Sequence, residues 1–285
     1  MNSKDSLQKE VRDKLSKFYI KPNFDLGQHF LMDSEIVKIL ANEVRPNHVV
    51  IEIGSGLGQL TEELAKRADS IISIEIDNRF KPILSQIVQR YPNVEIKYAD
   101  ALKVDLHEYE SQNLQIVSSL PYQISEAFMH KLAGLDFDCA ILLVGKRLSY
   151  AIQAENEEDP SFGQMTILSQ TFFDSEVIRI VSKKCFYPQP KTDSAIISLT
   201  PKVFDKTNKR DFLLRYLFKD LPKSPLIKNA IKEGLIEFHK INELENLSQN
   251  DAREVILVMK LSENLLNKSF QQLNNLEIGS LSKSL

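Results

Sequence analysis

The chain has 285 residues, of which 42% are hydrophobic and 26% charged, values ordinary for a globular protein with one large domain or a large and a small one. Its net charge of −3 argues against a surface that is basic throughout, so any contact with nucleic acid has to come from local patches. No apolar stretch approaches the roughly 20 residues of a membrane span, and the polar N-terminus lacks a signal-peptide core. Two cysteines and no secretory signal predict a cytoplasmic protein.

Strands and helices alternate along the first two thirds of the sequence. Apolar runs that end in glycine, acidic or turn residues are typical of buried parallel strands, and they fall at residues 48–53, 70–77, 94–98, 114–117 and 140–144. Helical spacing is found at 61–68 and 80–90, and later strands are expected at 176–181 and 194–199. This alternation predicts an α/β fold in which helices cover both faces of a mainly parallel sheet.

The pattern becomes helical after residue 201. Apolar residues at helical spacing predict helices at 211–218, 226–238 and 251–261, and the polar segment 202–210 is the predicted linker. We therefore expect an α/β domain at 1–201, which includes a mobile or helical lead-in over residues 1–22, and a helical domain at 202–285. The serine-rich tail 274–285 is expected to fray.

Three glycines follow the first predicted strand. Gly54, Gly56 and Gly58 allow the tight turn and the close ligand approach of a nucleotide-binding loop. The nicotinamide fingerprint is G-x-G-x-x-G, but Gln59 occupies its last position, so the pattern here is G-x-G-x-G. Glu52, just before the loop, would repel a pyrophosphate and suits a cationic ligand. S-adenosylmethionine carries a sulfonium and an amine and no phosphate, so we predict this cofactor.

Acidic residues end the next two predicted strands. Glu75 lies about 20 residues beyond the glycine loop, where a carboxylate can accept hydrogen bonds from both ribose hydroxyls of a nucleoside cofactor. Asp100 ends the third strand and could accept from the adenine amino group. Because the carboxyl ends of parallel strands meet at one edge of the sheet, these side chains are expected to surround a single ligand.

The fourth strand ends in Ser119-Leu120-Pro121-Tyr122. Enzymes that methylate exocyclic amines place an Asn- or Asp-Pro-Pro-aromatic motif at this position. An adenine amino nitrogen is a poor nucleophile because its lone pair is delocalised into the ring. A side-chain oxygen and the next backbone carbonyl can accept both N–H groups, and the aromatic ring stacks on the base and fixes the line of attack. The loop therefore predicts methylation of an exocyclic amine without a strong general base.

Together these motifs resemble the ribosomal RNA adenine N6,N6-dimethyltransferase family. The family's motifs have counterparts, in order, at residues 26–31, 52–58, 74–77, 99–101, 120–125 and 186–195. His29 and the Gln123-Ile124-Ser125 sequence are most similar to the archaeal small-subunit type. The resemblance implies a class I S-adenosylmethionine-dependent methyltransferase (Rossmann-like) sheet with a small C-terminal helical domain. It also implies N6-methylation, to the dimethyl stage, of adenines in small-subunit ribosomal RNA or a pre-ribosomal subunit by a monomer that takes part in ribosome biogenesis.

The resemblance assigns roles to individual residues. The implied cofactor contacts are Gln28, His29, Leu31, Gly54, Gly56, Glu75, Asp100, Ala101 and Ser119. The implied catalytic residues are Ser119, Leu120, Pro121, Tyr122 and Phe186. In this assignment the Ser119 side chain and the Leu120 carbonyl hold the amino group, while Tyr122 and Phe186 sandwich the adenine. The helical domain would recognise RNA.

Two departures from the family pattern leave alternatives open. Ser119 stands where the family has a catalytic Asn, and a serine hydroxyl is shorter and also donates hydrogen bonds. The segment 218–225, which in the family is basic, contains two prolines and no arginine pair. Both departures are compatible with a weak or inactive ribosome assembly factor, and a methyltransferase for large-subunit RNA is a second alternative. A nicotinamide oxidoreductase is disfavoured by Gln59 and Glu52.

Basic residues near the later motifs are candidates for phosphate contacts, although a solvated surface explains them equally well. They are Lys146, Arg147, Lys183, Lys184 and Lys191. No histidine pairs with a cysteine at the spacing of a metal site, so we expect no metal.

Overall fold

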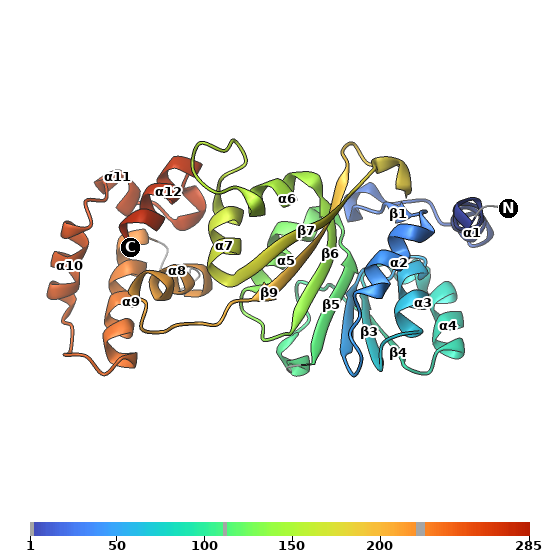
Figure 1. The fold of residues 1–285 in the computed structure, drawn as a ribbon, viewed down its shortest axis with the longest axis horizontal. Coiled ribbons are helices and arrows are strands. Elements are labelled where there is room, and N and C mark those ends of the chain that lie inside the picture. The colour runs from blue at the N-terminus through green and yellow to red at the C-terminus, as the bar shows by residue number, and fades with distance from the viewer. Residues whose placement is uncertain (1–2, 111–112, 221–225) are drawn as a thin grey trace. The chain divides into compact units, whose positions relative to one another are not determined.

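The computed structural model describes residues 3–110, 113–220 and 226–285, and the chain divides into two compact units (Figure 1). The first unit consists of Met1–Ser149 and Ser175–Pro201, and the second of Tyr150–Asp174 and Lys202–Leu285. The first unit ends at the residue predicted as the domain boundary. The second unit differs from the prediction because it also takes residues 150–174, whose helix α7 (Gln164–Phe172) packs against α8 (Lys209–Asp220).

A seven-stranded sheet forms the centre of the first unit, with the strand order β4-β3-β2-β5-β6-β9-β7. Its strands are β2 (Val49–Ile53), β3 (Ser70–Glu75), β4 (Val94–Tyr98), β5 (Leu114–Ser119), β6 (Cys139–Gly145), β7 (Phe173–Val181) and β9 (Ser194–Pro201). Strands β2 to β6 pair in parallel, whereas β9 runs antiparallel to β6. All seven predicted strands are therefore present, and the sheet is mainly parallel as expected.

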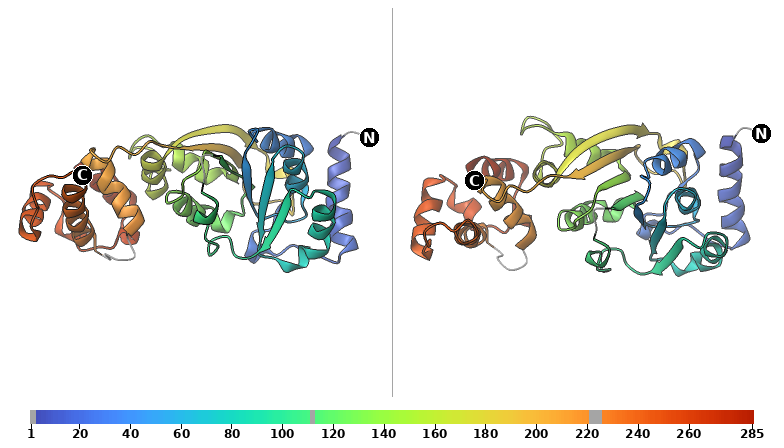
Figure 2. Two further views of the ribbon diagram at one scale, coloured as in Figure 1. Left: turned by 90° about the horizontal axis from the view of Figure 1, so that it is seen from below. Right: turned by 60° about the horizontal axis from the view of Figure 1, so that its bottom comes forward.

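Helices lie on both sides of this sheet, as the blue and teal helices on one side of the strands and the green helices on the other show in Figure 2. They are α2 (Ser34–Asn42), α3 (Gln59–Ala65), α4 (Lys81–Arg90), α5 (Ser125–Leu132) and α6 (Lys146–Gln153), whereas α1 (Ser3–Lys17) packs on α2. The start of α2 illustrates how the sequence determines where a helix begins. The Asp33 side chain accepts the backbone N–H of Glu35, and Ile36, Val37 and Leu40 then recur at helical spacing and are buried.

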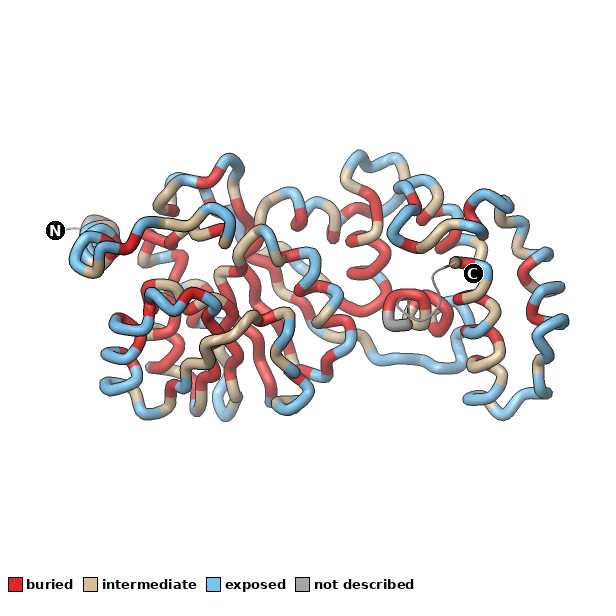
Figure 3. Tube along the Cα trace, turned by 180° about the vertical axis from the view of Figure 1, so that it is seen from behind, coloured by how far each residue is buried: buried red, intermediate tan, exposed pale blue. Residues whose placement is uncertain are grey.

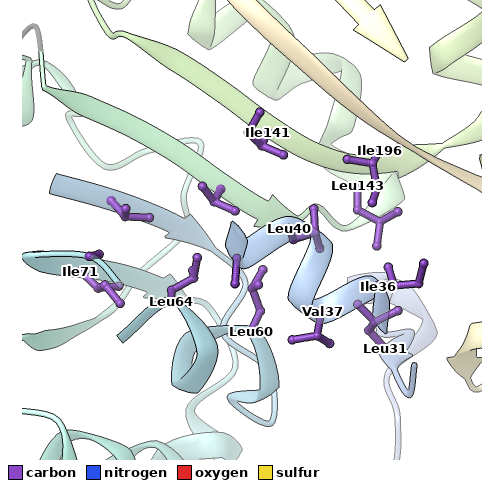
Figure 4. Packing of buried hydrophobic residues seen from close by; sticks show 14 of the residues in the cluster. Leu31, Ile36, Val37, Leu40, Leu60, Leu64, Ile71, Ile141, Leu143 and Ile196 are labelled. Atoms are coloured by element: carbon purple, nitrogen blue, oxygen red, sulfur yellow. The ribbon is translucent and has the colours of Figure 1, made fainter. Parts of the chain in front are cut away.

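The core of the first unit lies between α2, α3 and the strands. Leu40 and Leu64 project from the helices toward Ile71 of β3 and Ile141 of β6 (Figure 4). Buried segments run along the central strands in Figure 3, because parallel strands are covered on both faces. This packing holds the carboxyl ends of β2 to β5 at one edge of the sheet.

A short antiparallel ladder joins two motifs that are far apart in the sequence. Strand β1 (Phe30–Leu31) pairs with β8 (Phe186–Tyr187), so that Phe30 lies opposite Tyr187 and Leu31 opposite Phe186. The backbone N–H of Met32 extends the contact by donating to the carbonyl of Cys185 at 2.7 Å. The motif at 26–31 therefore lies beside the motif at 186–195.

The second unit is helical. Besides α7 and α8 it contains α9 (Ile227–Ile241), α10 (Gln249–Val258), α11 (Glu263–Leu266) and α12 (Asn275–Ser284). Phe218 packs on Phe270, with ring centroids 4.8 Å apart. The helices predicted at 211–218, 226–238 and 251–261 correspond to α8, α9 and α10. Of the segment 218–225, residues 221–225 lie outside the described residues.

The prediction that the tail frays was wrong. Asn274 and Glu277 form a reciprocal cap at the start of α12, in which each side chain accepts the other residue's backbone N–H. Ile278 and Leu281 then bury their side chains. Composition alone suggested a frayed terminus because serine is common in loops. The cap and the apolar residues at helical spacing stabilise a helix here instead.

Candidate active site

A pocket of about 930 Å³, including the space open to solvent at its mouth, lies at the carboxyl ends of β2 to β5 in the first unit. With one exception, every residue implied as a cofactor or catalytic contact lines it: Gln28, His29, Gly54, Gly56, Glu75, Asp100, Ala101, Ser119, Leu120, Pro121, Tyr122 and Phe186. The topology therefore brings together residues that are up to about 160 positions apart.

Leu31 is the exception. Its side chain is 5% exposed and packs in the hydrophobic core with Ile36 and Leu40, and it is not among the lining residues. The implied cofactor contact is therefore not made by this side chain. Leu31 lies opposite Phe186 in the β1–β8 ladder and shares its core cluster, but of the two only Phe186 also reaches the pocket.

The glycine loop adopts backbone conformations that favour glycine. Gly54, Gly56 and Gly58 have φ angles of 80°, 52° and 82°. The amide of Gly54 donates to the carbonyl of Ile74 at 2.8 Å, which fixes the loop to β3. A Cβ atom on Gly58 would lie 2.0 Å from the Cδ1 atom of buried Ile87, so a larger residue here would have to displace that side chain and adopt a strained φ angle. The loop thus keeps its backbone close to the pocket.

Glu75 anchors the loop and faces the pocket. Its Oε2 atom accepts the backbone N–H of Gly56 at 2.8 Å, and its Oε1 atom accepts that of Asp77 at 2.8 Å. The side chain is buried, and burial raises the pKa of Glu75 although both amides oppose this effect. A carboxylate offers about four acceptor positions, so capacity remains for two ribose hydroxyls.

The turn after β4 presents the second carboxylate. The Oδ1 atom of Asp100 accepts the N–H of Leu102 at 3.0 Å, and its Oδ2 atom lies 3.6 Å from the ammonium of Lys103. Ala101 lines the pocket next to it. Ile76 also lines the pocket and is 48% exposed, which gives a flat ligand an apolar surface. Sequence reasoning missed Ile76, although a large apolar residue directly after Glu75 is an available signal.

The charge of the lining separates two classes of ligand. Asp25, Glu75 and Asp100 contribute carboxylates, and within the described part of the chain no lysine or arginine lines the pocket. A pyrophosphate would meet carboxylates without a compensating cation, whereas a sulfonium and an amine are attracted. The lining therefore favours S-adenosylmethionine over a dinucleotide.

Glu52 does not contribute to this lining, which corrects the interpretation that it faces a cationic ligand. Its carboxylate is 1% exposed, and its Oε2 atom accepts hydroxyl hydrogen bonds from Thr61, at 2.7 Å, and Ser73. The Oε1 atom is buried and accepts no hydrogen bond from the described residues. Burial raises the pKa of Glu52 to about 7. The residue links β2, β3 and α3 beneath the loop.

We predict that Glu52→Gln reduces the pH dependence of stability. Between pH 4.5 and about 7 the folded carboxyl keeps a proton that the unfolded chain releases, so the wild type loses stability as pH rises through this interval. Each pH unit lowers the free energy of unfolding of the wild type by about 1.4 kcal/mol relative to Glu52→Gln. Over the whole interval this difference reaches roughly 3 kcal/mol. Denaturant unfolding of both proteins across this range measures it. Parallel stability profiles would contradict the raised pKa.

The loop after β5 lies against the same pocket. The backbone N–H of Leu120 donates to the carbonyl of Leu143 at 3.0 Å, and the Pro121 carbonyl accepts from the Ser125 hydroxyl at 3.1 Å. The Tyr122 hydroxyl is hydrogen-bonded to the Ser194 hydroxyl. Burial raises the pKa of Tyr122, so the phenol stays neutral. These contacts hold the Tyr122 ring at the pocket wall.

The motif at 26–31 closes one side of the pocket. Gln28 donates from Nε2 to Asp77 Oδ2 at 2.6 Å, next to the end of β3. The Nδ1 atom of His29 lies 2.7 Å from the Pro188 carbonyl, and its ring centroid lies 5.8 Å from that of Tyr122. The motif therefore connects the Glu75 side of the pocket to the Tyr122 side.

The candidate phosphate contacts lie in the first unit with different exposure. Arg147, Lys184 and Lys191 are exposed, and Lys146 and Lys183 are partly buried.

Among the described residues, no group of three or more His, Cys, Asp or Glu side chains could hold a metal ion. No helix in the described ranges has the length and apolar character needed to cross a membrane.

Three features together define a class I S-adenosylmethionine-dependent methyltransferase. They are the mainly parallel sheet with an antiparallel β9, the glycine loop after β2 and the carboxylates at successive strand ends. The chain belongs to the ribosomal RNA adenine dimethylase family, whose sequence model matches residues 20–264. This confirms the resemblance and the cofactor predicted from the motifs.

Named relatives share much of the length of the chain. A protein of Pyrococcus abyssi named "Probable ribosomal RNA small subunit methyltransferase A" is 37% identical over 223 residues, 77% of this chain and 79% of that protein. The ribosomal RNA small subunit methyltransferase A of Thermotoga petrophila is 34% identical over 252 residues, 87% of this chain and 94% of that protein.

Solved structures show the same fold. A dimethyladenosine transferase from Plasmodium falciparum superimposes with a TM-score of 0.61 at 24% identity, over 89% of this chain and 95% of that one. The 23S rRNA methyltransferase ErmE superimposes with a TM-score of 0.55 at 22% identity, over 90% of this chain and 99% of that one. The predicted fold class is confirmed.

Proposed function

We propose that this protein transfers methyl groups from S-adenosylmethionine to the N6 atom of adenines in small-subunit ribosomal RNA, to the dimethyl stage, during ribosome biogenesis. The observation that carries the proposal is that Ser119, Tyr122 and Phe186 line the same pocket as Glu75 and Asp100. A target base and a nucleoside cofactor can therefore meet there. The names of the Pyrococcus and Thermotoga relatives support the small-subunit substrate.

In the cofactor half of the pocket, Glu75 accepts hydrogen bonds from the ribose hydroxyls and Asp100 accepts one from the adenine amino group. Ile76 provides the apolar surface for the adenine ring. Gln28 and His29 cover this half from the side. The bound cofactor supplies an electrophilic methyl group on its sulfonium.

In the other half, the chain's residues orient the target amino group. The Ser119 hydroxyl oxygen and the Leu120 carbonyl accept its two N–H groups, which localises the nitrogen lone pair and aims it at the methyl group. The Tyr122 ring stacks on the base and is held by Ser194 and by packing against His29. Phe186, which is 3% exposed and lines the pocket, provides the opposite wall.

Ser119 sets the rate in this proposal. We predict that Ser119→Asn raises the rate of methyl transfer, because an amide oxygen reaches farther and does not itself donate to the amino group. Single-turnover methylation at saturating cofactor measures the change in both proteins, so that an effect of Ser119 on cofactor affinity does not enter the rate. A lower rate in Ser119→Asn would show that the site is tuned to serine.

Ser119 also favours a second candidate function, a ribosome assembly factor of weak or absent catalytic activity that keeps the fold. A methyl-transfer assay on immature small subunits, with primer-extension mapping of the product, tests the choice. Methylated adenines in small-subunit RNA support the enzyme. Binding of the subunit without methylation supports the assembly factor, and methylation of large-subunit RNA would overturn both.

We also infer that the helical unit recognises RNA and that the protein acts as a monomer in the cytoplasm. A ribosomal RNA substrate and two thiols support this location. Cys139 is buried in β6, and Cys185 lies 3.5 Å from Asp33 Oδ2, so the two cysteines do not pair with each other. Arg147, Lys184 and Lys191 would add phosphate contacts beside the pocket.

A further inference from the structure

Lys131 of α5 has an unusual set of partners. Its ammonium donates to the backbone carbonyl of Ala101 at 2.9 Å, to that of Leu102 at 3.2 Å and to that of Val104. Three carbonyl oxygens that converge on one point repel each other unless a cation lies between them. An ammonium has three N–H donors and matches this arrangement, whereas a planar guanidinium does not.

The three carbonyls belong to the turn that carries the Asp100 carboxylate. On the pocket side, Asp100 holds the turn through Oδ1, which accepts the N–H of Leu102, and through its carbonyl, which accepts those of Lys103 and Val104. On the other side Lys131 holds it. The turn is thus fixed between a residue that faces the pocket and one that does not line it.

The position of Lys131 also connects two parts of the site. Helix α5 directly follows the loop 119–124, so the ammonium joins the turn at 100–104 to the helix that carries this loop. Burial lowers the pKa of Lys131, while the carboxylates of Asp105 and Asp100 act in the opposite direction. The ammonium is therefore partly removed from water, which strengthens its dependence on the carbonyls.

We propose that Lys131 is a positioning residue that sets the selectivity of the pocket for adenine in the cofactor, because it fixes the turn that presents Asp100 and Ala101. This rests on the proposed function in one respect, namely that Asp100 accepts from the adenine amino group. The family match and the pocket do not assign a role to Lys131. Removal of the ammonium frees three carbonyls that repel each other, so the turn relaxes and the Asp100 carboxylate leaves its position.

The test compares two ligands that differ only at the base. S-adenosylhomocysteine carries the amino group that Asp100 recognises, and S-inosylhomocysteine carries a carbonyl oxygen there. Calorimetric titration of the full chain gives the dissociation constants. We expect Lys131→Met to weaken binding of the adenosine ligand about tenfold and that of the inosine ligand less than about twofold. The resulting loss of selectivity between the two ligands corresponds to about one hydrogen bond. In methyl transfer, the KM for S-adenosylmethionine should rise about tenfold with kcat nearly unchanged.

Two further variants make the test decisive. Lys131→Arg keeps the charge but cannot serve three carbonyls equally, and we expect an intermediate selectivity. Lys38→Met removes an exposed lysine of α2 that does not line the cofactor pocket, and its selectivity should equal that of the wild type. Binding of S-inosylhomocysteine shows that a variant is folded. If Lys131→Met does not fold, Lys131→Arg takes its place in the comparison with the wild type.

The outcomes separate the two proposals. If the wild type discriminates between the ligands and both Lys131 variants do so equally well, the role of Lys131 is overturned and the assignment of Asp100 stands. Equal weakening of both ligands also overturns it, because that result reports a general loss of structure. If the wild type does not discriminate, the assignment of Asp100 to adenine fails first and the role of Lys131 fails with it.

Discussion

Tyr122→Ala is expected to abolish methyl transfer while cofactor binding stays nearly intact. The ring is the stacking surface for the target base in the proposed mechanism, and without it the amino group is no longer held in line with the methyl group. Loss of such orientation costs on the order of a thousandfold or more in rate. The cofactor contacts proposed for the glycine loop, Glu75 and Asp100 follow other strands, so the dissociation constant should change less than about threefold. Single-turnover transfer and calorimetric titration measure the two quantities.

Tyr122→Phe is the matched control for this experiment. It keeps the ring but removes the hydrogen bond to the Ser194 hydroxyl, and packing against His29 remains. We expect a rate reduction below about tenfold, because one neutral hydrogen bond contributes on the order of 1 kcal/mol. Equal losses of binding and transfer in Tyr122→Ala would contradict the assigned role and indicate that the ring supports the pocket as a whole.

The second large effect is expected at Glu75. Glu75→Ala removes the proposed acceptor for the ribose hydroxyls and also the anchor of the Gly56 and Asp77 amides. Hydrogen bonds to a charged group contribute about 1.5–3 kcal/mol each, so the affinity for S-adenosylmethionine should fall by roughly a hundredfold or more. The stability should fall less than the lost hydrogen bonds imply, because removal of the carboxylate also relieves its desolvation.

Controls for Glu75→Ala distinguish binding from folding. Glu75→Gln keeps the shape and one acceptor oxygen, and its affinity should lie between those of the wild type and Glu75→Ala. Glu95→Ala removes an exposed carboxylate of β4 that does not line the pocket, and it should bind the cofactor like the wild type. Equal effects of Glu75→Ala and Glu95→Ala on affinity would refute the ribose contact.

Much of the α/β unit was predictable because its signals are local. Strands such as β2 and β3 are apolar runs followed by glycine or acid, and their topology follows from the rules for parallel sheets. The strand ends then predicted which side chains would meet. The assignment of these residues to cofactor and base stays a prediction until the variants above are measured.

Other features depended on contacts that a sequence pattern does not reveal. Glu52 looked like a ligand contact by its position in the chain, but Thr61 and Ser73 supply hydroxyls that draw its carboxylate beneath the loop. A strand as short as β1 gives no alternation to read, so the sequence does not reveal that the Leu31 side chain packs in the core. Residues 150–174 joined the helical unit through packing of α7 on α8, which no local signal marks.

The acidic lining of the pocket has a consequence for turnover. Methyl transfer converts the positively charged sulfonium into a neutral thioether, so the attraction exerted by Asp25, Glu75 and Asp100 weakens at the moment of reaction. The spent cofactor therefore binds with less electrostatic help than the fresh one. An enzyme that adds two methyl groups to one nitrogen has to exchange cofactor between the two transfers, and a pocket with no lysine or arginine in its described lining favours that exchange.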